Sequence, residues 1–92
     1  MMYNIIKTPN GYAAEIAANL RRLRKRKKLS MEALAKKSGV SYGSIKRFES
    51  TGQISLTSLL KIAIVLDCAE PFSDLFKYPE ITSIQEIIDG EV

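Results

Sequence analysis

The chain has 92 residues, 46% of them hydrophobic and 26% charged, which suits one small folded domain and excludes a disordered segment. It contains no histidine and a single cysteine, Cys68, which excludes histidine-based metal sites, hydrolytic triads, four-cysteine zinc sites and internal disulfides. Cys68 is expected to be a small buried hydrophobe. No apolar run reaches the length of a membrane span, and residues 1–10 lack a signal-peptide pattern, so we expect a cytoplasmic protein without metal or cofactor.

The net charge of +4 is unevenly distributed along the chain. Residues 1–61 carry 13 Lys/Arg and 3 Asp/Glu, a net charge of +10, whereas residues 62–92 carry 1 Lys/Arg and 7 Asp/Glu, a net charge of −6. The alternative is an ordinary solvated charged surface, which a bias sustained over so long a stretch makes the weaker interpretation. The bias predicts a basic face that attracts a polyanion from one side and an acidic region away from that face.

Residues 1–11 are predicted to form an N-terminal arm, which ends in the chain-breaking residues 9–11 and whose role is open. A first helix is predicted from about Tyr12 to Lys28. Its second half, RRLRKRKK, has two open interpretations: a solvated helix end, or contact with phosphates. The expected buried side of this helix consists of Ala13, Ile16, Ala17, Leu20 and Leu23.

The stretch from Ser30 to Glu49 predicts two short helices joined by a tight turn. Ser30 and Ser41 are suited to cap the two helices, and Gly39 is suited to end the first one in a left-handed conformation. The residues expected to face inwards are Leu34, Ala35, Val40, Ile45 and Phe48. This spacing is typical of a helix-turn-helix, whose second helix enters the major groove of DNA.

Three further segments follow the helix-turn-helix. Ser55 is predicted to cap a strongly apolar fourth helix over residues 56–66, and Pro71 to open a fifth helix over residues 72–76, whose aromatic side chains are expected to close the core. Residues 79–92 form a tail with a capping box, Ser83 to Glu86, and a short helix. That helix is too short to be stable alone, so its isoleucines are expected to contact a second subunit or another partner: Ile84, Ile87 and Ile88.

Residues 16–76 resemble the lambda-repressor/Cro (XRE) helix-turn-helix family in motif, spacing and helix order. The resemblance implies an all-α fold: a lambda-repressor-like five-helix DNA-binding domain over residues 12–78, here with a short C-terminal tail helix. It also implies a structural ion pair between Arg24 and Glu49, and base reading by the start of the second motif helix. The alternative for Arg24 and Glu49 is two surface charges that never meet.

Individual side chains suggest how DNA would be contacted. Arg47 matches guanine O6 and N7, although it could equally clamp a phosphate; Tyr42 could contact a thymine methyl group or remain a surface aromatic. Gly43 is costly in a helix and would let the backbone approach DNA closely, or is merely tolerated in a first turn. The remaining candidate phosphate ligands are Ser41, Ser44, Lys46, Lys36 and Lys37.

The stretch RFESTGQISLTSLLKIAIVLD with its acidic tail is similar to HipB-like antitoxins, regulators that accompany HipA-type kinase toxins. Two functions therefore stay open. The first is a sequence-specific repressor that binds a double-stranded operator as a homodimer on the nucleoid. The second is an antitoxin that holds a toxin protein and regulates its own operon. An enzyme is not expected, because the chain offers no acid/base pair and no glycine-rich phosphate loop.

Overall fold

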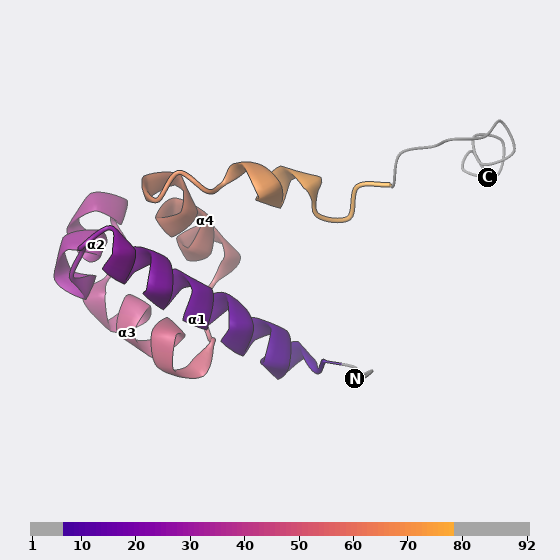
Figure 1. Ribbon diagram of the computed structural model, residues 1–92, viewed down its shortest axis with the longest axis horizontal. Helices are drawn as coiled ribbons and strands as arrows, with labels where there is room; N and C mark the ends of the chain where they lie inside the picture. Colours follow the sequence, from indigo (N-terminus) through magenta and orange to yellow (C-terminus); the bar gives the residue numbers. More distant parts are fainter. Residues whose placement is uncertain (1–6, 79–92) are drawn as a thin grey trace, which may run out of the picture.

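The computed structural model describes residues 7–78, which form four α-helices and one short 3₁₀-helix, with no strand among them (Figure 1). The helices are α1 (Pro9–Arg26), α2 (Met31–Ser38), α3 (Tyr42–Thr51), α4 (Leu56–Val65) and η1 (Glu70–Asp74). The prediction of an all-helical fold is therefore confirmed. The count of five α-helices was wrong, because the fifth segment is a 3₁₀-helix that ends before Leu75 and Phe76.

Each α-helix begins at a hydroxyl side chain that accepts a hydrogen bond from the backbone N–H three residues later. Ser30, Ser41 and Ser55 cap α2, α3 and α4 in this way, as the sequence predicted. The first helix was expected at about Tyr12 but begins at Pro9, behind the capping residue Thr8. The first N–H of a helix has no partner within the helix, so proline, which lacks an N–H and has a fixed φ, suits the first helical position. Pro9 therefore opens α1 and does not break the chain before it.

The helices end in two ways. Gly39 and Gly52 close α2 and α3 in the left-handed conformation, with φ of 77° and 79°. At the ends of α1 and α4 the same conformation is taken by Lys28 and Asp67, each followed by a residue whose N–H bonds back into the helix. These are Schellman-type ends formed without glycine. The two helices end at Arg26 and Val65, two residues and one residue before their predicted ends.

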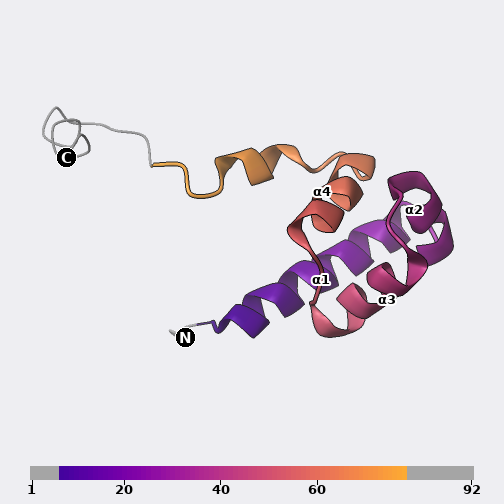
Figure 2. The same ribbon diagram turned by 180° about the vertical axis from the view of Figure 1, so that it is seen from behind.

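The helices surround one small core. The two opposite views show α1 running along α3, with α2 at the C-terminal end of α1 (Figures 1 and 2). Helix α2 also packs against α4. The buried hydrophobic residues are Ala17, Leu20, Leu34, Val40, Ile45, Phe48, Ile62, Ala63 and Leu66. Ile16 was wrongly expected in this core and is 42% exposed, because it borders an open apolar pocket rather than a packed helix.

The segment from η1 to Tyr78 leads away from the helical body (Figure 1). Phe72 is half-buried and lines an apolar pocket of about 120 Å³ between α1 and α4, together with the partly buried Cys68. Phe76, by contrast, is fully exposed, so the expectation that both aromatic residues close the core was wrong for Phe76. It lies two residues beyond η1, where the chain has already turned outwards.

Two predictions fall outside residues 7–78: the N-terminal arm as far as residue 6, and the tail helix with Ile84, Ile87 and Ile88. The division into arm, domain and tail stays a prediction. Among the described residues, no helix combines the length and the apolar character needed to cross a membrane.

Candidate nucleic-acid interface

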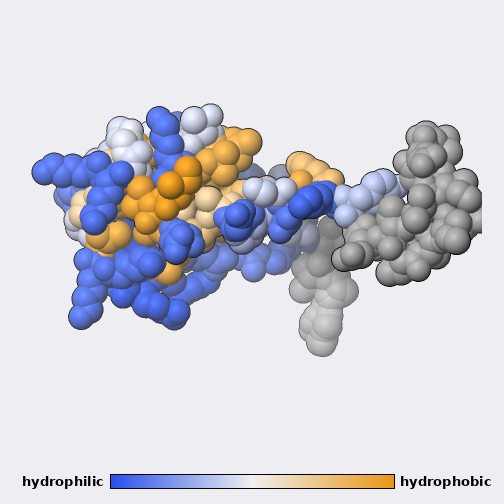
Figure 3. Space-filling view, turned by 90° about the horizontal axis from the view of Figure 1, so that it is seen from above, coloured by the Kyte–Doolittle hydropathy of each residue, from blue (hydrophilic) through white to orange (hydrophobic). Residues whose placement is uncertain are grey.

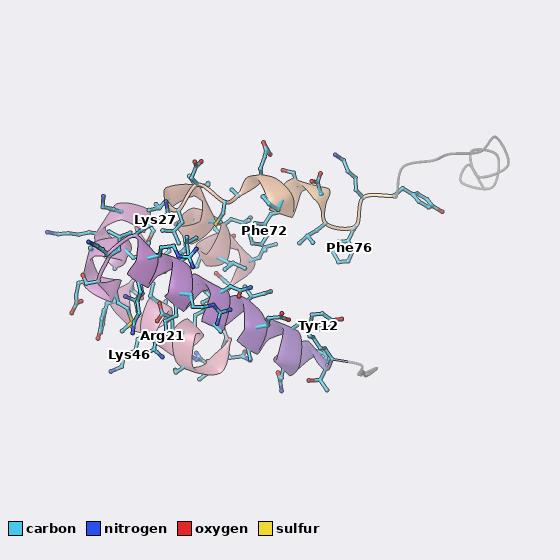
Figure 4. All side chains as sticks on the ribbon, in the orientation of Figure 1. Tyr12, Arg21, Lys27, Lys46, Phe72 and Phe76 are labelled. Carbon is cyan, nitrogen blue, oxygen red and sulfur yellow. The ribbon has the colours of Figure 1, made fainter. Side chains whose placement is uncertain are left out.

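The outward side of α3 carries most of the residues that the sequence analysis assigned to DNA. Ile45 and Phe48 point into the core and hold the opposite side of this helix. Figure 4 shows Lys46 extending from α3 away from the rest of the domain. The exposed candidates brought together by α3 and its capping residue are Ser41, Tyr42, Gly43, Ser44, Lys46 and Arg47.

Ser41 and Ser44 form a small hydroxyl cluster at the start of α3. The Ser41 Oγ accepts the Ser44 N–H at 3.1 Å, and the Ser41 and Ser44 Oγ atoms lie 2.9 Å apart in a hydrogen bond. Ser41 is therefore occupied by capping, whereas the Ser44 hydroxyl keeps further hydrogen-bonding capacity towards a ligand. Of the two serines, Ser44 is the better placed to contact a phosphate or a base.

Arg47 borders an open, mixed polar pocket between α3 and the start of α4. The pocket has a volume of about 330 Å³ and includes Ser44 on the α3 side. On the α4 side it is lined by Gln53, Ser55 and Ser58. From the sequence, Ser55 was predicted only as a cap, and no role was predicted for Gln53 or Ser58. These residues line the pocket only because α4 starts beside α3. The spacing of polar residues along the sequence does not predict that arrangement of the two helices.

The charge of this side is positive and is not neutralised by α3 itself. The only carboxylate in α3, Glu49, is bound to Arg24 and largely buried. Lys36 and Lys37 lie exposed in the last turn of α2, next to the turn that leads into α3. Of the basic residues in the second half of α1 and the turn after it, Arg24 is buried and the other six are exposed: Arg21, Arg22, Lys25, Arg26, Lys27 and Lys28.

Arg24 fixes α3 to the corner between α1 and α2. Its Nε and Nη2 donate to the two carboxylate oxygens of Glu49, at 2.7 and 2.9 Å, and its Nη1 donates to the Leu29 carbonyl at 2.8 Å. The two side chains are only 8% and 7% exposed. Hydrogen bonding to Glu49 raises the pKa of Arg24 above its ordinary value, so the guanidinium stays charged throughout the neutral range. The pair therefore ties the end of α3 to α1, and the Leu29 contact ties both to the turn before α2.

A second surface, the apolar groove, lies along α4 and η1. It has a volume of about 410 Å³ and is formed mainly by Leu56, Leu60, Ile64, Phe72, Leu75 and Phe76. On the face that carries these elements, hydrophobic side chains form a band bordered by hydrophilic ones (Figure 3). Ile64 is 67% exposed, although a side chain of its type is usually buried. Exposed apolar patches of this kind mark protein contacts.

Among residues 7–78, no group of three or more acidic or cysteine side chains could hold a metal ion. The side chains of α3 and its capping residue supply hydrogen-bonding and charged groups: a guanidinium, an ammonium, hydroxyl groups and a phenol. These are the groups that contact base edges and phosphates.

Comparison with known protein families gives a match to the model described as "Helix-turn-helix" over residues 20–72, more than half of the chain. The matched region runs from the second half of α1 through α4 and into η1. Searches among curated proteins and among solved structures found no match.

Proposed function

The chain belongs to the XRE-type helix-turn-helix family, a family of DNA-binding transcription regulators, and from this premise we propose that it is a sequence-specific repressor that binds its operator as a homodimer. It would act in the cytoplasm, on the nucleoid. The observation that carries the proposal is the outward side of α3. It presents Lys46, Arg47 and the Ser44 hydroxyl, while its one carboxylate, that of Glu49, is bound to Arg24.

The proposed reading mechanism assigns separate tasks to neighbouring side chains. Arg47 would donate two hydrogen bonds to guanine O6 and N7 on the groove floor. Lys46, Lys36 and Lys37 would contact phosphates, and so would the serine hydroxyls around the pocket beside Arg47. The phosphate contacts would fix the orientation of α3, and the base contacts would supply the sequence preference.

A homodimer is supported by the apolar groove along α4 and η1. One recognition helix reads only a few base pairs, so two copies related by a two-fold axis are expected to place their α3 helices roughly 34 Å apart, one turn of DNA. The groove of Leu56, Leu60 and Ile64 offers the second copy an apolar surface on the described part of the chain. The tail isoleucines Ile84, Ile87 and Ile88 would extend the same contact.

Selection of bound sequences from random double-stranded DNA tests this proposal. We expect a two-fold symmetric motif with half-sites one helical turn apart, each containing a G·C pair that Arg47 reads. A pool that remains random after selection, although the protein is folded, would refute sequence-specific binding. An asymmetric single motif would refute the dimer but keep the recognition helix.

The alternative function is that of an antitoxin for a HipA-type toxin, with DNA binding reserved for autoregulation. The same apolar groove supports it, because a toxin surface could cover Leu56 and Ile64 in place of a second copy. A kinase-like gene next to this one would favour it. Co-expression of the two chains, followed by size-exclusion chromatography, should then give a stable complex that Ile64→Lys disrupts.

A further inference from the structure

Gly43 has no role within the protein that requires a glycine. Its φ is not in the left-handed region, unlike those of Gly39 and Gly52. A Cβ atom built on Gly43 meets no atom within 4 Å outside its own helix backbone and chain neighbours. Glycine also weakens a helix relative to alanine, so the fold alone would favour alanine at this position.

Helix geometry places Gly43 in the middle of the outward side of α3. With about 100° between successive residues, it lies about 170° from the mean direction of Ile45 and Phe48, the two buried residues of this helix. On the same scale Lys46 lies about 60° to one side of Gly43 and Arg47 about 40° to the other, one turn later. The missing side chain therefore leaves a gap between the two basic residues.

We propose that this gap receives the 5-methyl group of a thymine on the floor of the major groove, so that Gly43 makes the protein select thymine at one base pair of each half-site. The proposal rests on the proposed function, because it requires α3 in the groove. The edges of a recognition helix face the phosphate-lined walls, whereas its midline faces the base edges. On that floor the thymine methyl is the apolar group that projects towards the helix.

The proposal predicts that a methyl group on the protein and a methyl group on the DNA compete for one space. The test uses the duplex obtained by selection, with each thymine replaced in turn by uracil, which lacks only the methyl group. Gly43→Ala should melt at the same temperature as the wild type or higher. It should bind the thymine duplex at least about tenfold more weakly, the effect of overpacking a close contact.

The decisive result is the response of this variant to uracil. At one thymine per half-site, replacement by uracil should restore the affinity of Gly43→Ala to within about threefold of the wild type on the same duplex, and should weaken wild-type binding. Gly11→Ala adds the same methyl group to the first turn of α1, where its Cβ would lie 3.3 Å from the capping Thr8 Oγ1. It serves as the control once its melting temperature has been measured, with unchanged affinity expected for both duplexes.

Four results would overturn the inference. Gly43→Ala could bind the thymine duplex as tightly as the wild type, or no uracil replacement could restore its binding. It could melt well below the wild type, which would assign Gly43 a role in the fold. Finally, the selected motif could contain no thymine. In each case wild-type binding to the operator would leave the proposed function standing, whereas a wild-type protein that binds no DNA would refute both.

Discussion

At the scale of single residues, the buried guanidinium of Arg24 joins α3, the candidate recognition helix, to the rest of the fold. Its bidentate pair with Glu49 and its bond to the Leu29 carbonyl connect α1, the following turn and the end of α3. The Leu29 N–H in turn donates to the Arg24 carbonyl at 3.0 Å, so the two residues are joined twice. A network of this kind stabilises the fold only while both charges are present.

Arg24→Ala should lower the free energy of unfolding by about 3 kcal/mol, because it leaves the Glu49 carboxylate buried without a counter-charge. Urea unfolding measures this change. The matched control is Arg22→Ala, whose arginine lies exposed on the same helix and should cost no more than about 0.5 kcal/mol. Equal midpoints for the two variants would mean that the pair contributes no more than a surface contact.

Arg47→Ala and Lys46→Ala should separate base reading from phosphate binding. Loss of the guanine contact in Arg47→Ala should cost about 1–3 kcal/mol per half-site and relax the preference at one base pair. Lys46→Ala should weaken binding to all sequences alike and reduce the slope of log affinity against log salt by about 0.9 per subunit, about 1.8 for a dimer.

Both variants are measured on operator and on scrambled DNA at several salt concentrations. The two side chains leave α3 about 100° apart, so they cannot both point at the groove floor. If Lys46→Ala loses the base preference and Arg47→Ala weakens both DNAs equally, the two roles are reversed. If neither changes operator binding, α3 is not the recognition helix.

At the scale of helices, α2 and α3 end in glycines whose replacement would have different effects. A side chain at Gly39 would strain only the backbone, whereas a side chain at Gly52 would also contact α1. Both end in a glycine of positive φ, but a Cβ on Gly39 meets nothing within 4 Å. A Cβ on Gly52 would lie 3.0 Å from the Cβ of Ala13 and 3.2 Å from its carbonyl carbon. The end of α3 therefore sits directly against the backbone of α1.

Gly39→Ala should cost about 1–2 kcal/mol, the penalty of the left-handed conformation for a residue with a side chain. Gly52→Ala should cost at least about 1 kcal/mol more, because it also overpacks the contact with α1. Urea unfolding of the two variants gives the difference. Equal costs would show that α1 moves away from α3 without penalty.

At the scale of the whole molecule, the basic side chains and the apolar groove lie largely on different elements. Most exposed basic side chains belong to α1, α2, α3 and the turn after α1, whereas most exposed large hydrophobic side chains belong to α4 and the segment up to Tyr78. Under the proposed function, DNA and a second copy of the chain would therefore be bound on different parts of the surface, as dimeric repression requires.

Ile64→Lys should dissociate the dimer and weaken operator binding while changing the free energy of unfolding of the monomer by no more than about 0.5 kcal/mol, because Ile64 is exposed in the monomer. Sedimentation equilibrium gives the oligomeric state. Ala18→Lys adds the same charge to an exposed position of α1, outside the groove, and should leave the dimer intact. A wild-type chain that is monomeric at high micromolar concentration, with affinity unchanged on dilution, would refute the dimer.

The sequence by itself determined the helical class, the motif and the starts of α2, α3 and α4. These features depend on local interactions: a serine hydroxyl bonds an N–H three residues later, and the spacing of apolar residues marks the inner side of each helix. The candidate reading residues could be listed for the same reason, since they follow one capping serine along a single helix.

The tertiary structure decided which neighbours those residues meet. Periodicity marked Ile16 as inward-facing, but only the arrangement of α1, α4 and η1 leaves it beside an open pocket. The pocket beside Arg47 forms because α4 starts next to α3, and Phe76 is exposed because the chain turns outwards after η1. Burial and steric contact depend on residues that are far apart in the chain. The local pattern of the sequence could therefore not predict them.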